Sequence, residues 1–450
     1  MILSSAKDFK NIFKESNNRI KGINFFRIGV FLLPSAFYIS TLFILIASIT
    51  NCRNRGKKLF INNWNYPLYL STILILLSCF NNYLSFGKIE DLQIESKISI
   101  FLDIANWVPF FYIFISCRSF LSNTILRRDF SMLLISGSFP ILLSGFYQYF
   151  LFKLNFPESF YGPYQILRGL IVWYQRPINI NGETGITSIF NNPNYLGCWL
   201  IVLLPFSISL LFEKNKGFYK KIISLIFLLS IIISIVLTKS KAAINLLALS
   251  IPITFNFNLS ITIFLLIFFF ISTGIIIYMA NSDFSINLEI IPKAILNDYS
   301  RESLSENLRR EFRFNIWINA INFIKIDPIF GLGAGIFPMI YLLRKGNWVA
   351  HTHNLFLELA FNHGILVAFT IIVFIVFLIF KSFYTLKESL FRESFNNNFL
   401  NKTWWSSTVL LILSQMVDLQ YYDGRVSMTL WLLLSGLLSI IQEKEPTLET

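Results

Sequence analysis

The amino-acid sequence predicts an all-α polytopic membrane protein with about 11–12 transmembrane helices. The 450 residues are 54% hydrophobic and only 14% charged, whereas a soluble domain carries about 25% charged residues. The mean hydropathy is +0.60. Apolar runs recur along the chain, and each is close to the roughly 20 residues that a helix needs to cross a bilayer.

These runs divide the chain into membrane and loop regions. We expect a basic cytoplasmic tail at 1–23, transmembrane helices over 24–280 with an external loop at 153–193, a large external loop at 281–352, further transmembrane helices over 353–441, and a tail at 442–450. The apolar runs that predict the individual helices lie at 24–49, 66–86, 98–121, 130–152, 194–213, 219–237, 241–256, 260–280, 353–380, 403–419 and 425–441.

The basic residues predict which loops face the cytoplasm. They concentrate near 50–65, 118–129, 214–221 and 381–402, and these loops are separated by even numbers of crossings, so all four can be cytoplasmic together. The basic N-terminal tail also favours the cytoplasm, but a single span at 24–49 would put it outside. Pro34 can break that run into a short hairpin or a re-entrant pair, but 26 residues are too few for two full spans, so the sequence leaves this conflict open.

The composition argues against nucleic-acid binding and against some kinds of transporter. The net charge of +13 follows from the orienting loops and a general bias to Ile, Asn, Lys and Phe, and no nucleic-acid-binding pattern accompanies it. No internal repeat is visible, which counts against a transporter built from inverted halves. The four cysteines are scattered without a CxxC pair, so we interpret them as small buried residues.

The predicted external loops hold the unusual residues. Loop 153–193 contains Arg176, an NGETG turn at Asn181–Gly185 and the sequence FNNPN at Phe190–Asn194. Short polar residues with Gly and Pro favour a structured turn entering the next span, although an ordinary loop would have a similar composition.

Loop 281–352 predicts an amphipathic helix. Ser303 or Ser305 can cap it, and Pro328 stops it. Arg309, Arg313 and Trp317 follow one another at a spacing of four beside an apolar stripe; the alternative is that these arginines are solvated or paired with nearby glutamates. The stripe consists of Leu308, Phe312, Ile316, Ala320, Phe323 and Ile324.

Three alternating glycines follow that helix. Gly331, Gly333 and Gly335 allow the backbone to approach a ligand closely, and successive N–H groups can cradle a phosphate. The segment does not follow a strand, so it is not a dinucleotide-binding fingerprint.

All three histidines of the chain lie between His351 and His363. Asn354, Glu358 and Asn362 recur every four residues there, and a carboxylate one turn into a span predicts a polar cavity at the outer helix mouth. A metal site is one reading of His-x-His, but no third ligand is evident. A passive interfacial histidine is another. We favour a general base, because a neutral imidazole can take a proton from a hydroxyl near neutral pH.

Together these motifs resemble the O-antigen ligase and O-antigen polymerase-like superfamily. His353-Asn354 followed after nine residues by Gly364 matches its histidine motif, and Arg313, Trp317, Pro328 and the glycines match its R-x-x-x-W…P-x-x-G-x-G segment. Further similar stretches are FNNPN, the LTKSKAA turn at Leu237–Ala243 and DLQYYDGR at Asp418–Arg425, which resembles a late external loop of cyanobacterial-looking members. The matches span roughly residues 176–436.

The resemblance implies a glycosyltransferase C-like fold and a metal-independent reaction without a cofactor. A glycan would move from a polyprenyl-pyrophosphate carrier to an acceptor hydroxyl at the periplasmic face of a bacterial inner membrane. For a ligase the acceptor is the lipid A core, and for a polymerase it is a growing chain. Other partners are membrane lipids, and no nucleic acid is expected.

The resemblance also implies roles for residues of this sequence. His353 becomes the catalytic base, with Asn354 and Glu358 as its orienting neighbours. The donor pyrophosphate would meet Arg313 first, then Arg176, with Lys241 and Arg425 weaker. Lys241 stands where the family usually has arginine, so it lacks the bidentate fork suited to phosphate. The remaining supporting positions are Gly331, Gly333, Gly335, Gly364 and Asn194.

The ligase reading has rivals that the sequence leaves open. A polymerase or a protein O-glycan transferase would share the fold and the histidine. A glycan or lipid transporter would need charged residues deep in several spans, whereas the polar residues here gather at predicted outer helix ends. A purely structural membrane protein would not explain why the glycines, the polar stripe and the histidines follow one another.

Overall fold

The computed structural model describes residues 20–84, 99–157, 162–166, 171–175, 178, 185–213, 217–255, 313–346, 348–389 and 395–444. Contacts divide the chain into two compact units. Unit 1 comprises residues 1–72, 104–257 and 371–450, and unit 2 comprises residues 73–103 and 258–370. The predicted span at 260–280, the caps Ser303 and Ser305, and the stripe residues Leu308 and Phe312 lie outside the described residues.

The predicted class, an all-α polytopic membrane protein, is confirmed. Seven stretches among the described residues are helical, long and apolar enough to cross a membrane, and the total of 11–12 stays a prediction because 256–312 is not described. The seven are Asn63–Leu84, Ile100–Leu121, Thr124–Lys153, Pro193–Leu211, Phe218–Leu237, Ile365–Glu388 and Gly424–Glu443.

Unit 1 is a helical bundle with a small β-hairpin. The antiparallel strands β1 (Gly162–Ile166) and β2 (Ile171–Gln175) add to the helical class a feature that composition did not predict. The helices are α2 (Ile23–Leu32), α3 (Phe37–Arg55), η1 (Gly56–Leu59), η2 (Asn63–Asn65), the start of α4 (Tyr66–Leu84), α6 (Ile104–Cys117), η3 (Arg118–Leu121), α7 (Thr124–Gly137), α8 (Phe139–Lys153), α9 (Pro193–Leu211), α10 (Phe218–Leu237), α11 (Lys241–Phe255), most of α18 (Ile365–Ser389), α19 (Phe395–Val417) and α20 (Gly424–Lys444).

The core of unit 1 is centred on α9, α19 and α20. Trp199, Trp404 and Trp431 come from these three helices and are fully buried. The indole N–H of Trp404 donates to the Leu433 carbonyl at 2.9 Å, and Gly436 gives room to the Trp404 ring. Helix α10, in contrast, leaves a row of large apolar side chains exposed, as expected of a surface in contact with lipid.

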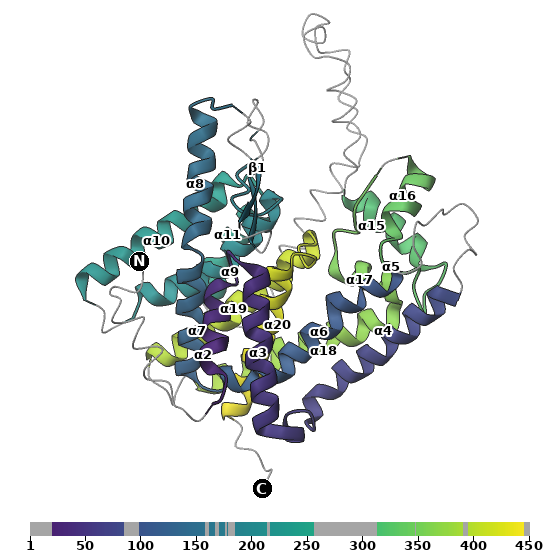
Figure 1. The fold of residues 1–450 in the computed structure, drawn as a ribbon, viewed down its shortest axis with the longest axis horizontal. Helices are drawn as coiled ribbons and strands as arrows, with labels where there is room; N and C mark the ends of the chain where they lie inside the picture. The colour runs from purple at the N-terminus through teal and green to yellow at the C-terminus, as the bar shows by residue number, and fades with distance from the viewer. Residues whose placement is uncertain are drawn as a thin grey trace, which may run out of the picture. The chain divides into compact units, whose positions relative to one another are not determined.

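The run at 24–49 folds as a helical hairpin with Pro34 in its turn, so both ends of the run can face the same side. Helices α2 and α3 lie side by side (purple in Figure 1), and Ser40 Oγ donates to the Gly29 carbonyl at 2.7 Å. At Gly29 a Cβ would lie 2.5 Å from Ile44 Cγ1, so the two helices touch closely there. Lys21 therefore lies at the same end of unit 1 as the basic segment Arg53–Lys58.

Two other predicted spans are also interrupted. The run at 130–152 lies within α7 and α8, which meet at Ser138. The run at 353–380 contains α17 (Leu355–His363) and the start of α18, separated by Gly364 at φ +90°. Any Cβ at Gly364 would overlap the carbonyl oxygen of Ile329, so this break requires glycine.

Unit 2 packs short helices around an aromatic cluster. It contains the end of α4, α5 (Ser99–Leu102), α15 (Arg313–Ile324), α16 (Phe337–Lys345), α17 and the first turns of α18. Phe323, Phe337, Tyr341 and Phe361 join α15, α16 and α17 through ring contacts, with Phe337 and Phe361 edge to face at 5.1 Å. The described part of the predicted stripe on α15 is buried, and the helix ends at Ile324, shortly before Pro328.

Cysteine labelling tests the hairpin. In a chain whose four native cysteines are replaced by alanine, Lys21→Cys and Lys57→Cys should both react with a membrane-impermeant maleimide in inverted vesicles. Phe156→Cys, just after α8, should react in right-side-out vesicles and serves as the control for the other side. Reaction of positions 21 and 57 from opposite sides would contradict the hairpin.

Candidate functional site

His353 occupies a strained and accessible position in unit 2. It lies in the loop before α17, half-exposed, with φ at +56°, a left-handed conformation that residues with a Cβ seldom adopt. Its backbone N–H donates to His351 Nδ1 at 3.3 Å, and the centroids of the two imidazole rings are 4.3 Å apart. Such strain persists only where the surroundings hold it, and it concentrates at functional sites.

The surroundings that hold this loop are the predicted neighbours of His353. Asn354 caps α17, because its Oδ1 accepts the N–H of Leu357 at 3.1 Å. Glu358 is almost fully buried, and its carboxylate accepts the N–H of Thr352 at 2.9 Å. Thr352 Oγ1 in turn donates to the Asn354 carbonyl at 2.9 Å. Asn354 and Glu358 therefore fix the backbone on both sides of His353.

His363, at the other end of α17, has a different environment. Its Nε2 lies 2.8 Å from Asp103 Oδ2, and each side chain is only 1% exposed. Asn362 Nδ2 also reaches Asp103 Oδ2, at 3.4 Å, and Ser78 Oγ lies 3.5 Å from His363 Nδ1. This imidazole is enclosed by protein and paired with a carboxylate, so it has the surroundings of a structural residue.

Sequence reasoning did not single out Asp103. A signal was present, because Asp103 is a lone carboxylate within the apolar run 98–121, and intramembrane carboxylates require a partner. Its partner could not be read from the sequence, since His363 is 260 positions away. The polar stripe of α17 likewise finds protein partners, with Glu358 bound to Thr352 and Asn362 to Asp103.

The glycine segment packs against the end of α17. The N–H of Leu332 donates to the Phe361 carbonyl at 2.7 Å and that of Gly333 to the Asn362 carbonyl at 3.2 Å, which satisfies two carbonyls at the helix terminus. At Gly331 a Cβ would lie 2.6 Å from both His363 N and Phe361 O. These two N–H groups are therefore engaged with the protein, and close backbone packing explains Gly331 without a ligand.

Arg313 begins α15, whose buried face packs on α17. Its side chain is half-exposed, so it can reach a ligand. One turn along, the indole N–H of Trp317 is buried and has no acceptor among the described residues. Unit 2 thus contains Arg313, Trp317 and His353. The indole N–H of Trp317 is a hydrogen-bond donor without an acceptor among the described residues.

Arg425 lines a cavity of about 470 Å³ in unit 1. It is only 9% exposed, its guanidinium carbon lies 4.5 Å from the Phe190 ring centroid, and its Nε is 3.9 Å from Asp423 Oδ1. Its Nη1 is buried and has no hydrogen-bond partner within the described part of the chain. A buried guanidinium N–H without an acceptor is unfavourable, and an anion bound beside it would provide one. Other residues lining the cavity are Ser35, Tyr38, Asn106, Phe110 and Tyr422.

Of the remaining predicted residues, Asn194 and Lys241 lie in unit 1. Lys241 is exposed at the first turn of α11, and the N–H of Asn194 donates to Asn192 Oδ1 at 2.8 Å in the turn that starts α9. Arg176 lies outside the described residues. The segments that resemble family motifs do contact one another. Gly197 of α9 lies close to Ser240 and Ala243 of the LTKSKAA turn, and the Arg425 guanidinium lies over the ring of Phe190 in FNNPN.

No group of three or more His, Cys, Asp or Glu side chains in the described ranges is arranged to hold a metal ion. The described cysteines are free thiols. Cys79, Cys117 and Cys198 are buried, in agreement with the interpretation as small core residues, whereas Cys52 is only half-buried.

Comparison with known protein families confirms the resemblance drawn from the motifs. Residues 225–372 match a family model described as O-Antigen ligase. The matched region includes Lys241, Arg313, the three glycines and His353, and it leaves out Asn194 and Arg425. It supports glycan transfer of the O-antigen ligase or polymerase type in a multi-pass membrane protein, with lipid-linked glycans as substrates. No curated protein matches the chain.

Two glycine substitutions distinguish close packing from simple backbone strain. Both Gly331→Ala and Gly335→Ala place a side chain at a positive φ. An added Cβ at position 331 would also overlap protein atoms, whereas at position 335 it would meet open space. Gly331→Ala should therefore lower the free energy of unfolding by about 1–3 kcal/mol more than Gly335→Ala does. Thermal unfolding in detergent measures the difference, and equal losses would contradict the packing argument.

Proposed function

We propose that this protein is an O-antigen ligase-type glycosyltransferase that moves a glycan from a polyprenyl-pyrophosphate carrier to an acceptor hydroxyl of the lipid A core. The observation that carries the proposal is the setting of His353, a half-exposed imidazole held in a strained loop inside the segment that matches the family model. The reaction takes place at the outer face of a bacterial inner membrane.

In this reaction the acceptor oxygen attacks the anomeric carbon of the donor glycan. The bond from that carbon to the phosphate oxygen breaks, and the pyrophosphate leaves with the electron pair. The acceptor proton passes to the neutral imidazole of His353. A general base positioned for this proton contributes about 10²–10⁴-fold to the rate.

The geometry favours His353 over His363 as the base. His363 is 1% exposed and lies against the Asp103 carboxylate, so an acceptor hydroxyl cannot reach its ring without disrupting that pair. His353 is accessible, and Asn354 and Glu358 act as positioning residues because they fix the backbone before and after it. Pre-organisation of this kind keeps the base in its reactive geometry.

Cationic side chains stabilise the departing pyrophosphate. Arg313 and Arg176 remain the first candidates, with Lys241 as a weaker one. Arg425 is a further candidate, because it lines a cavity and its buried Nη1 has no hydrogen-bond partner among the described residues. A guanidinium can bind two phosphate oxygens at once, which suits charge that develops on the leaving group.

A polymerase is the second candidate, because the same chemistry applies when the acceptor is a sugar hydroxyl of a growing chain. The family match covers both. The two differ in product: loss of a ligase removes all glycan-capped core, whereas loss of a polymerase leaves single repeats on the core. A glycan or lipid transporter would yield no covalent product from purified protein and substrates.

The central test compares two neighbouring histidines. The gene is deleted in its own host and complemented with wild type, His353→Ala or His351→Ala, and the surface glycolipids are separated on a gel. His353→Ala should abolish the transferred product while the protein is still inserted, and His351→Ala, the matched control, should retain most of it. If the His353→Ala strain showed the wild-type glycolipid pattern on the gel, His353 would not be the general base.

Arg425→Lys tests the leaving-group role. Lysine keeps the charge but cannot form a bidentate contact, so turnover of the lipid-linked donor by the reconstituted protein should fall about 10²-fold. Lys221→Gln removes an exposed charge of α10 and should leave turnover unchanged. Unaltered turnover in Arg425→Lys would exclude Arg425 from the pyrophosphate site.

A further inference from the structure

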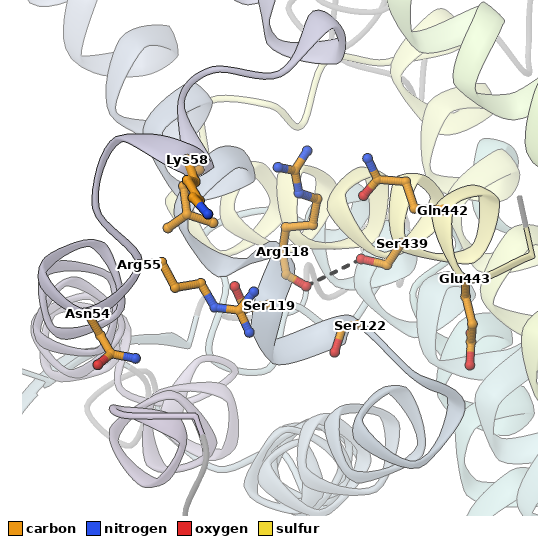
Figure 2. A pocket seen from close by; sticks show the side chains of 10 residues that line it. Asn54, Arg55, Lys58, Arg118, Ser119, Ser122, Ser439, Gln442 and Glu443 are labelled. Carbon is orange, nitrogen blue, oxygen red and sulfur yellow. Dashed lines mark hydrogen bonds between the residues drawn. The ribbon is translucent and has the colours of Figure 1, made fainter. Parts of the chain in front are cut away.

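A second cavity of unit 1 lies at the opposite end of the helices that form the Arg425 cavity. Its volume is about 710 Å³. The Arg425 cavity is lined from the starts of α3 and α20 and from α6 as far as Ile113. The second cavity is lined from the ends of α3 and α20 and from η3, which follows α6. Its lining residues include Asn54, Arg55, Lys58, Arg118, Ser122 and Gln442 (Figure 2).

Arg118 is the buried cation of this cavity. It is 8% exposed, and its Nη1 is buried without a hydrogen-bond partner among the residues that the structure describes. Its backbone is held in place, because Ser439 Oγ donates to the Arg118 carbonyl at 3.3 Å, the contact drawn in Figure 2. A buried guanidinium N–H that lacks an acceptor is unfavourable, and an anion entering the cavity would provide one.

The rest of the lining adds positive charge at the mouth. Arg55 and Lys58 line the same cavity and are both exposed. The one carboxylate in the lining, Glu443, is already engaged, because Arg127 Nη2 forms an ion pair with it. Arg127 is itself fully buried and further bound to Asn401 and the Leu121 carbonyl. The cavity lining is therefore cationic, because the charge of its carboxylate, Glu443, is balanced by Arg127.

The residues that follow Lys58 indicate the level of the bilayer at which the cavity opens. Ile61 is 72% exposed and Tyr66 is 58% exposed, while the Trp64 ring stacks on Phe377 at 5.6 Å. Exposed apolar and aromatic side chains directly beside lysines are typical of the membrane–water interface, where phosphate headgroups lie. Basic pockets between transmembrane helices on the cytoplasmic side are suited to anionic headgroups.

We propose that this cavity binds the phosphate headgroup of an anionic lipid. Arg118 is its buried ligand, Arg55 and Lys58 attract the headgroup at the mouth, and Ser122 and Gln442 offer further donors. This site is independent of the proposed transfer chemistry, and it lies where the basic loops predict the cytoplasmic face. A bound lipid would join the ends of α3, α6 and α20 and stabilise unit 1.

The test follows thermal unfolding of the full chain in a neutral detergent. Phosphatidylglycerol should raise the unfolding temperature in a saturable way, whereas phosphatidylcholine with the same acyl chains should not. Inorganic phosphate forms a third arm. If phosphate alone produced the same rise at the same concentration, the ligand would be a free anion, and the assignment to a lipid would be overturned.

Paired variants locate the effect. Arg55→Gln with Lys58→Gln should raise the half-saturating concentration of phosphatidylglycerol by about 25-fold, or about fivefold for each cation removed, which corresponds to roughly 1 kcal/mol per surface cation. Arg118→Gln should have a comparable or larger effect. Arg53→Gln with Lys57→Gln removes two neighbouring exposed charges that do not line the cavity and should change nothing. If both double variants raised the half-saturating concentration equally, the proposed site would be overturned. This comparison does not depend on Arg118→Gln, so it remains decisive even if that variant does not fold.

Discussion

The buried contact between His363 and Asp103 is the interaction on which the geometry of unit 2 depends. It joins the end of α17 to the residue that follows α5, two parts of the chain that are far apart in sequence. In a low-dielectric interior such a pair is stable only with further hydrogen bonds; Asn362 Nδ2 donates to the same Asp103 Oδ2, and Ser78 Oγ lies beside His363 Nδ1. With that end of α17 fixed, the Gly331–Gly333 backbone can pack against the last carbonyls of the helix.

The consequence for function appears at the other end of the same helix. Helix α17 has only nine residues, so a fixed end at His363 also fixes the loop that Asn354 caps. Glu358 then reaches back to Thr352, and His353 is left in a left-handed conformation that costs about 1–3 kcal/mol. The structure thus gives two histidines ten positions apart different environments: one is buried and paired, and the other is strained and accessible.

Much of this organisation could be predicted from local sequence signals. Apolar runs predicted the membrane class, Pro34 the break in the first run, and the spacing of Ile316, Ala320, Phe323 and Ile324 the buried face of α15. The order of short motifs pointed to the family whose model matches residues 225–372. These signals are local, because each depends on helix periodicity, on proline geometry or on a short motif.

What the sequence did not reveal was long-range pairing. The partner of Asp103 is set by how α17 packs, and the open Nη1 groups of Arg425 and Arg118 become visible only when their cavities are formed. The glycines suggested a phosphate cradle, but the N–H groups of Leu332 and Gly333 are bonded to the end of α17. The same residue types serve a ligand or a helix terminus, and only tertiary structure distinguishes the two.

The most direct measurement of this division of roles compares purified His353→Gln and His363→Gln in one preparation, following both thermal unfolding and glycan transfer. The proposed roles predict that His353→Gln unfolds like wild type but loses transfer, and that His363→Gln unfolds at a clearly lower temperature because Asp103 is left buried without its partner. If His363→Gln kept full stability, or if His353→Gln kept full transfer, the assignment of a structural and a catalytic histidine would be contradicted.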